Sequence, residues 1–285
     1  MRNKLPVILI VLLLGCSAKQ APLPDANLKA IDLNQRAGMA FRDGNYANAV
    51  ALYSGALRVN RSIENADGIA IDLINISAVY RKMGDGEKAE RAIEEILNSN
   101  TPGFGDGHLS EAAFMKALLR LDAGAVSEAE DWAKKSLSYC EKAKCGKDGR
   151  IYNLMARISL KKADYPAAVS QADKGLKLNK EHEDSEEAAN SIRLMAEAKF
   201  LSGNHAEALR LYEDALSMDK SLALSGKIAL DLMGAGNSLC EMGKNEEALS
   251  YFQRALEVSK SGGNDPLAAQ AVEMVRKCVV KRLKK

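Results

Sequence analysis

Leu201-Ser-Gly-Asn-His-Ala-Glu-Ala-Leu-Arg-Leu-Tyr-Glu-Asp-Ala-Leu216 contains a pattern that recurs along nearly the whole sequence. Gly203 in this stretch is followed by alanine after five residues, by an aromatic residue after nine and by alanine again after twelve. Anchor residues equivalent to Gly203 recur every 39 or 40 residues, at Gly44, Gly84, Gly124, Ala163, Gly203 and Gly243. A fixed period of this length is typical of proteins built from stacked repeats.

Two helical segments are predicted within each period. Apolar residues recur at helical spacing, and the first two such runs are Leu28–Asp43 and Tyr46–Asn60. Gly44 between them can adopt the left-handed conformation that ends a helix. Alanine stands five residues after every anchor, and a small residue stands seven before it: Ala37, Ser77, Ala117, Ala156, Ala196 and Gly236. Small side chains at both places let the two helices pack closely, and the resulting hairpins must stack to bury their apolar faces.

This order of small residue, turn, alanine, aromatic residue and alanine resembles the tetratricopeptide repeat. The resemblance covers residues 28–261 as six units and implies an all-α fold, an α-solenoid of six helical hairpins. It is weakest in the third unit, where Ala133 and Ser136 replace a bulky residue and an alanine. Such repeats have a period of about 34 residues, so the longer period here predicts either longer helices or longer connections.

One further helix is predicted after the six units, within residues 265–285. The segment Pro266–Leu283 is amphipathic, Asp265 suits the N-cap and Pro266 suits the first helical turn. We expect this helix to cap the solenoid, because a terminal repeat needs a polar outer face. Its basic end either complements the helix dipole or contacts anionic lipid headgroups.

Residues 1–15 are predicted to be a lipoprotein signal peptide. A short basic start precedes an apolar run over residues 5–14, which is too short to span a bilayer as a helix. The run ends in Leu13-Leu-Gly-Cys16, which resembles the lipobox of bacterial lipoproteins. This resemblance implies that Cys16 becomes acylated and begins a tether over residues 16–27; the alternative is an ordinary cleaved signal. Ser17, in place of aspartate, implies sorting to the outer membrane.

Charge argues against nucleic-acid binding. The formal net charge of the whole chain is +2, and removal of Arg2 and Lys4 with the leader lowers the 40 basic residues to 38, against 38 acidic ones. A nearly neutral protein lacks the field that attracts nucleic acid.

Catalysis and metal binding find little support in the sequence. The three histidines fall in predicted connections, each apart from any metal-spaced group: His108, His182 and His205. The acids of Glu181-His-Glu-Asp-Ser-Glu-Glu187 are better explained by the start of a helix, where the dipole favours negative charge. Gly103-Phe-Gly-Asp-Gly107 has no preceding strand and no following Lys-Ser/Thr, which argues against a phosphate loop. We therefore expect no enzyme activity, no metal, no cofactor and no small-molecule substrate.

Four cysteines remain besides Cys16. Cys140 and Cys145 lie five residues apart, and in an exported protein they either form a small disulfide loop or stay reduced. Cys240 and Cys278 lie on apolar helical faces, where we expect buried thiols.

The resemblance also implies a groove for partners along the first helix of each unit. The groove positions of the family fall thirteen, ten, six and two residues before the anchor. In the fourth unit these are Arg150, Asn153, Arg157 and Lys161, to which the next two units add Asn190, Arg193, Glu197 and Asn237. Arginine can hold a carboxylate through two parallel hydrogen bonds, and asparagine can hold a peptide backbone. The alternative is a solvated charged face without a ligand.

Taken together, these patterns predict a lipid-anchored scaffold that binds a protein or peptide partner. Its expected place is the cell envelope, at the periplasmic face of the outer membrane. Similar lipoproteins serve outer-membrane assembly, secretion or pilus biogenesis, and cell-wall synthesis. The alternatives are a structural spacer without a groove ligand and an accessory subunit of an enzyme.

Overall fold

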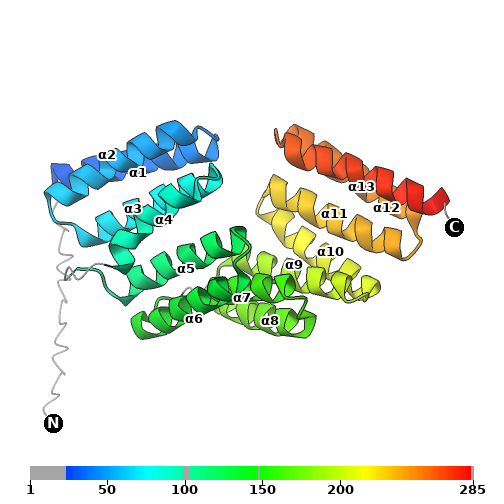
Figure 1. Cartoon of the computed structure of the whole chain (residues 1–285). Coiled ribbons are helices and arrows are strands. Elements are labelled where there is room, and N and C mark those ends of the chain that lie inside the picture. The colour runs from blue at the N-terminus through cyan, green and yellow to red at the C-terminus, as the bar shows by residue number, and fades with distance from the viewer. Residues whose placement is uncertain (1–23, 99–102, 147, 284–285) are drawn as a thin grey trace, which may run out of the picture.

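The computed structural model describes residues 24–98, 103–146 and 148–283, and this part of the chain consists of thirteen α-helices (Figure 1). They are α1 (Asp25–Arg42), α2 (Tyr46–Ser62), α3 (Ala66–Lys82), α4 (Gly86–Leu97), α5 (Asp106–Asp122), α6 (Val126–Ala143), α7 (Asp148–Lys161), α8 (Tyr165–Glu181), α9 (Ser185–Leu201), α10 (His205–Ser221), α11 (Ser225–Glu241), α12 (Asn245–Ser261) and α13 (Asp265–Leu283). The predicted solenoid of six hairpins with a final helix is confirmed.

The first helix begins earlier than expected. Helix α1 starts at Asp25, so the last three residues of the segment interpreted as a tether are helical. The predicted signal peptide, Cys16 and the start of the predicted tether lie outside the described residues, as does part of the connection around Thr101. None of the described helices combines the length and the hydropathy needed to cross a membrane.

Long helices, and not long connections, account for the extended period. Most helices have 17 residues and are joined by three-residue turns, so one hairpin with its two turns fills 40 positions. Each anchor residue has positive φ, including Ala163 at 56°, which takes the conformation that glycine adopts in the other units. The exception is α4, which has 12 residues and is followed by a longer connection to α5.

Close packing inside each hairpin depends on the small residues identified in the sequence. All six alanines that follow the anchors are completely buried, as are five of the six small residues that precede them: Ala49, Ala89, Ala129, Ala168, Ala208, Ala248, Ala37, Ser77, Ala117, Ala156 and Ala196. The sixth, Gly236, lies against an aromatic ring: a Cβ atom there would come within 2.6 Å of Cε1 of Phe252. Larger side chains at these positions would force the two helices apart.

Ser136 explains how the third unit tolerates its departure from the pattern. The Oγ of Ser136 donates to the carbonyl of Ser110, and the Oγ of Ser110 donates to the carbonyl of Ser136, each at 2.9 Å. Both serines are buried. This reciprocal pair joins α5 to α6 by hydrogen bonds at the position where the first, fifth and sixth units have alanine, namely Ala56, Ala215 and Ala255.

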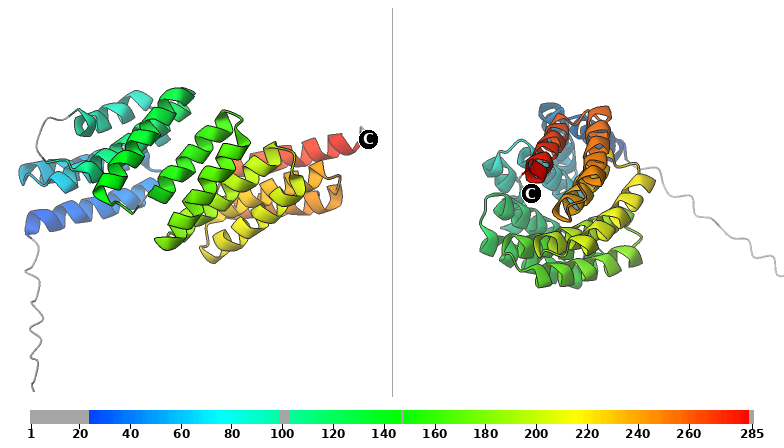
Figure 2. Two further views of the ribbon diagram at one scale, coloured as in Figure 1. Left: turned by 90° about the horizontal axis from the view of Figure 1, so that it is seen from below. Right: turned by 90° about the vertical axis from the view of Figure 1, so that its right-hand side faces the viewer.

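The hairpins stack so that the first helices of successive units contact one another. Among the described helices, the second helix of each unit packs against the first helix of the next, as in α8 with α9. The first helices of successive units also contact one another, as in α3 with α5 and α7 with α9, whereas the even-numbered helices do not touch each other. The odd-numbered helices therefore line the inner surface. Viewed along its length, the array winds around a common axis (Figure 2).

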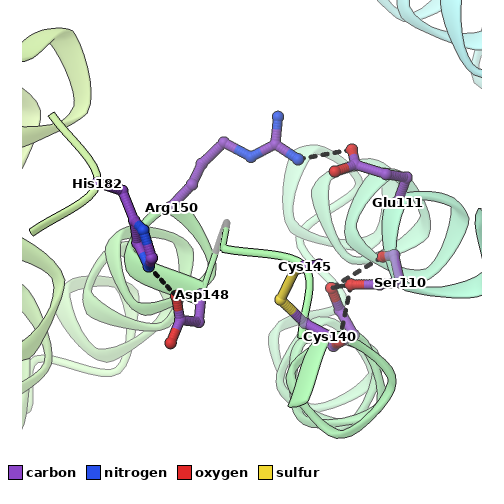
Figure 3. The surroundings of a disulfide bond; sticks show 8 residues. Ser110, Glu111, Cys140, Cys145, Asp148, Arg150 and His182 are labelled. Carbon is purple, nitrogen blue, oxygen red and sulfur yellow. Dashed lines mark hydrogen bonds and ion pairs between the residues drawn. A yellow bond between two sulfur atoms is a disulfide. The ribbon is translucent and has the colours of Figure 1, made fainter. Parts of the chain in front are cut away.

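A disulfide joins Cys140 to Cys145, the pairing that the sequence left open. It closes the end of α6, where Lys144 adopts the left-handed conformation with φ of 49°. Figure 3 shows this disulfide beside Ser110 of α5 and before the start of α7 at Asp148.

The expectation of two buried thiols at Cys240 and Cys278 is wrong. Both side chains are buried, but a disulfide joins them and links α11 to α13. The two residues lie 38 positions apart, and they meet because α13 folds back onto α11.

The predicted N-cap of α13 is also corrected. The side chain of Asn264, and not that of Asp265, accepts a hydrogen bond from the helix, at 3.2 Å from the amide nitrogen of Leu267.

The disulfide between α11 and α13 should contribute strongly to stability. We expect the double variant Cys240→Ala, Cys278→Ala to lose about 3 to 4 kcal/mol of unfolding free energy, because the bond closes a long loop in the unfolded chain. Denaturant unfolding measures this loss. The variant Cys140→Ala, Cys145→Ala is the comparison, and its shorter loop predicts a loss of about 2 kcal/mol. An equal or smaller loss for the longer loop would contradict the prediction.

Candidate functional site

Six of the predicted groove residues line one cavity on the inner surface. The cavity has a volume of about 260 Å³ and lies mainly between α7 and α9. Its lining consists of Phe114, Arg150, Asn153, Leu154, Arg157, Glu187, Asn190, Arg193, Leu194 and Glu197. Glu197, the acidic groove position of the fifth unit, is part of it, whereas Lys161 and Asn237 are not.

Arg150 is held in place by two residues of α5. Its Nη2 atom donates to Oε2 of Glu111 at 2.6 Å, as Figure 3 shows, and its guanidinium lies 4.2 Å from the centre of the Phe114 ring. The ion pair compensates the charge of Arg150, and the stacking limits its rotation. Arg150 therefore forms a wall of the cavity with a fixed orientation.

Asn153 connects helices and does not face the cavity as a free amide. Its Nδ2 donates to the carbonyl and the carboxylate of Glu187 at 3.0 and 2.8 Å, and its Oδ1 accepts from Ser191 at 2.6 Å. The side chain is buried. Both polar atoms of Asn153 thus join α7 to α9, and the predicted role of this residue in holding a peptide backbone stays a prediction.

Arg193 is also engaged inside the protein. Its guanidinium reaches two completely buried carboxylates, donating from Nε to Oδ1 of Asp231 at 2.6 Å and from Nη2 to Asp219. Its Nη1 donates to Oδ1 of Asn190 at 2.6 Å. The predicted contact of Arg193 with a partner stays a prediction, and in this structure its guanidinium is paired with the two aspartates.

Arg157 is the guanidinium that the groove leaves available. Its side chain is open to solvent, and no hydrogen bond or ion pair joins it to any other residue that the structure describes. The surrounding walls nevertheless restrict its hydration, which lowers its pKa, and Arg81 lowers the pKa further, while Asp122, Glu197 and Glu187 raise it. Arginine stays charged under these conditions, so the groove presents a cation that no described residue contacts through a hydrogen bond or ion pair.

Glu197 occupies the equivalent position on the next helix of the inner surface. It too is open to solvent but surrounded by the groove walls, and this environment raises the pKa of its carboxyl while Arg157 and Lys161 lower it. The cation of α7 and the anion of α9 therefore face the same hollow. An exposed residue within a groove can show such a pKa shift, because the groove walls displace part of the water around its side chain.

The other predicted groove residues have different surroundings. Lys161 is exposed at the end of α7, near enough to Glu197 to lower its pKa. Asn190 uses its Oδ1 to accept from Arg193 and, at 3.0 Å, from Nζ of Lys227. Asn237 is partly buried on α11, away from the cavity.

The acidic segment before α9 starts a helix, as predicted. The side chain of Asp184 is the N-cap and accepts from the amide of Glu187 at 3.0 Å, and Glu186 lies in the first turn. Within residues 24–98, 103–146 and 148–283, no group of three or more metal-binding side chains converges. His108 and His182 each lie near one aspartate, at 3.1 Å from Asp67 and 3.7 Å from Asp148.

Comparison with protein families identifies the repeats. A family model described as tetratricopeptide repeat matches residues 30–101 and 148–221, which together make up just over half of the chain. A second model with the same description matches residues 232–261. No curated protein matches the sequence.

Solved structures with low sequence identity share the fold. The chain resembles a signal-transduction ATPase with a tetratricopeptide repeat sensor from Pyrococcus horikoshii, with a TM-score of 0.67 and 17% identity, covering 88% of this chain and 37% of the ATPase. It also resembles a Rap protein complexed with competence and sporulation factor (TM-score 0.60, 15% identity, 90% and 78% covered). Aspartyl phosphate phosphatase F from Bacillus subtilis is similar as well (TM-score 0.63, 11% identity, 90% and 80% covered).

Asn153 should act as a structural residue. We expect Asn153→Ala to lower the unfolding free energy by about 1 to 3 kcal/mol, because it removes the buried hydrogen bonds of Asn153 with the Ser191 hydroxyl and with Glu187. Thermal or denaturant unfolding measures the effect. Asn237→Ala is the matched control, since Asn237 occupies a groove position without these buried contacts, and we expect a change of less than about 0.5 kcal/mol. Equal losses for the two variants would contradict the assignment.

Proposed function

Because the chain belongs to the tetratricopeptide repeat family, we propose that it is a protein-binding scaffold whose groove between α7 and α9 receives a partner segment. Repeats of this family suggest a scaffold for protein–protein interaction. The observation that carries the proposal is Arg157, an unpaired guanidinium in a concave cavity formed by two adjacent units. An unpaired charged group on an inner surface can form strong charge-assisted hydrogen bonds with a ligand of opposite charge.

The cavity suits a peptide segment that carries a carboxylate. Arg157 can bind a carboxylate through two parallel hydrogen bonds. Lys161 adds a second cation at the end of the same helix, and Glu197 on α9 can accept from the backbone or from a basic side chain of the partner. Arg150, fixed by Glu111 and Phe114, lines the same cavity nearer the start of α7. A Rap protein of similar fold has been seen in complex with competence and sporulation factor, which supports ligand binding by such an array.

We also propose that the protein works in the cell envelope, attached to the membrane by lipid on Cys16. The four described cysteines form two disulfides, which supports an oxidising compartment. They pair with one another, so none of them is a partner for Cys16. A lipobox-like sequence at that cysteine supports acylation, and several acyl chains anchor far more firmly than one. The periplasmic face of the outer membrane is the proposed location.

The proposed activity is binding, without catalysis. In the envelope, the partner would belong to outer-membrane assembly, to secretion or pilus biogenesis, or to cell-wall synthesis. The competing function is that of a spacer, which would use the outer helices and leave the groove empty. If the protein were instead an accessory subunit of an enzyme, its contact with that enzyme would also lie outside the cavity. Substitutions in the groove separate these functions because they leave the outer surface unchanged.

Charge reversal in the groove tests partner binding. We expect Arg157→Glu to lose at least about tenfold in the yield of its crosslinked partner in intact cells, because the variant repels a carboxylate that the arginine attracts. The captured proteins are identified and quantified by mass spectrometry. Arg210→Glu, an exposed substitution on the outer helix α10, is the control with the same change of charge. Equal yields for wild type and Arg157→Glu would refute the groove and favour the spacer.

Substitution of Cys16 tests the anchor independently of the groove. We expect Cys16→Ser to abolish labelling with a palmitate analogue and to move the protein from the membrane fraction to the soluble fraction. Ser17→Ala keeps the cysteine and should retain both labelling and membrane attachment. Continued labelling of Cys16→Ser would contradict the lipoprotein assignment.

A further inference from the structure

A buried cluster of three charged residues joins the fifth and sixth units. Arg193 extends from α9 to Asp219 at the end of α10 and to Asp231 near the start of α11. Its Nη2 atom donates to both carboxylates, at 3.3 Å to Oδ2 of Asp231 and by a short bond to Oδ2 of Asp219. Both aspartates are completely buried, and the arginine side chain is 15% exposed.

The charges of this cluster do not balance when both aspartates are ionised. One guanidinium then faces two carboxylates, which leaves a net negative charge in the protein interior. Burial of an uncompensated charge is strongly unfavourable. A proton held by the two carboxylates removes the imbalance, because the pair then carries one negative charge against the single positive charge of Arg193.

The neighbouring cation Lys227 does not replace that proton. Lys227 of α11 donates to Glu186 and Asn190 of α9, at 2.7 and 3.0 Å, and is thereby committed to those residues. Tyr212 of α10 and Glu197 of α9 also act on this region, and neither supplies positive charge.

The helices that pack on the far side of α11 contribute apolar contacts. Ala255 of α12 and Ala271 of α13 belong to the apolar cluster around Leu232 of α11. They exclude water without adding charge. The electrostatic balance of the cluster therefore depends on Arg193 and on the ionisation of the two aspartates.

The pKa of Asp231 agrees with a proton retained by the two carboxylates. Burial raises the pKa of Asp231 to about 7, the neighbouring Asp219 also raises it, and the opposing effect of Arg193 is smaller than that of burial. Because the two carboxylates share one guanidinium, this titration belongs to the pair.

The corresponding positions at two other junctions form a singly charged pair and a neutral pair. At the junction of the first two units, Nδ2 of Asn60 donates to Asp72 at 2.7 Å. At the junction of the fourth and fifth units, Nδ2 of Asn179 donates to the Ser191 hydroxyl at 3.1 Å. Asn60, Asn179 and Asp219 occupy one repeat position, sixteen residues after their anchors, and Asp72, Ser191 and Asp231 occupy another, twelve before theirs. Among these three junctions, two carboxylates meet only between the fifth and sixth units.

We propose that Arg193, Asp219 and Asp231 form a pH-sensitive joint between the fifth and sixth units, closed by a shared proton and loosened when that proton leaves. The joint goes beyond the proposed binding function, since it depends neither on a ligand in the groove nor on the lipid anchor. Because Arg193 also lines the groove, loosening of the joint changes the wall that α9 contributes.

The sign of the effect follows from proton linkage. The folded protein keeps a proton that the unfolded chain, with an ordinary aspartate, releases near pH 4. The stability due to this proton is therefore fully present below about pH 4 and is lost as the pH rises to about 7. Between these limits the unfolding equilibrium constant should rise by up to about tenfold per pH unit.

Denaturant unfolding of the full chain between pH 5 and pH 8 tests the joint. We expect the unfolding constant of the wild type to increase over pH 5 to 7 and to level off above, and we expect Asp231→Asn to lose this increase. Asp214→Asn, an exposed substitution on α10 with the same change of charge, should keep it. The same pH dependence for wild type and Asp231→Asn would overturn the proposal.

A direct measurement on the wild type covers the case in which Asp231→Asn fails to fold. Carbon-13 NMR of the aspartate carboxyl groups reports each titration, and the signals of the buried pair should include one transition near pH 7. If both Asp219 and Asp231 complete their titration near pH 4, the joint holds no proton at neutral pH and the proposal fails.

Discussion

Close approach of two helices within each hairpin is the constraint on which the rest of the structure depends. Alanine stands five residues after each anchor and a small residue seven before it, and almost all of these side chains are completely buried. Gly236 illustrates the limit, because the ring of Phe252 occupies the space that a Cβ atom would need. A hairpin packed this closely still exposes an apolar side, which the next hairpin covers. The solenoid follows from that repeated requirement.

Stacking converts equivalent sequence positions into neighbours in space. The first helices of successive units line the inner surface, so Arg157 of the fourth unit and Glu197 of the fifth face one hollow. The same geometry also brings polar residues into the junctions between units. Asn153 and Arg193 occupy groove positions in sequence, but their hydrogen bonds are used inside the protein. The groove therefore offers fewer free groups than its sequence suggests, and Arg157 is prominent among them.

The junctions differ in chemistry although their backbone geometry is similar. One contains an amide and a carboxylate, another an amide and a hydroxyl, and the junction around Arg193 contains two carboxylates. The last helix is attached by the disulfide between Cys240 and Cys278. A uniform backbone thus carries local differences in charge and covalent linkage, and these differences distinguish one end of the array from the other.

The fold could be read from the sequence because its signals are local and repeated. The positions of Gly203, Ala208 and Tyr212, repeated every 39 or 40 residues, were sufficient to predict helical hairpins that stack. The period did not show whether helices or turns had lengthened, because both change the spacing equally. The site was predicted only in part: the sequence placed Arg150, Asn153, Arg157, Asn190 and Arg193 around one groove, and the structure brings these five together.

Tertiary structure alone decided which of these side chains remain free. The engagement of Arg193 depends on Asp219 and Asp231, which lie 26 and 38 residues away in sequence. The pairing of Cys240 with Cys278 likewise depends on how α13 folds back. Helical periodicity gives the face on which a residue lies, whereas the partner of a buried polar group is set by contacts between elements distant in sequence. For this reason, the sequence by itself determined the architecture and the location of the groove, and only the packed structure determined its available chemistry.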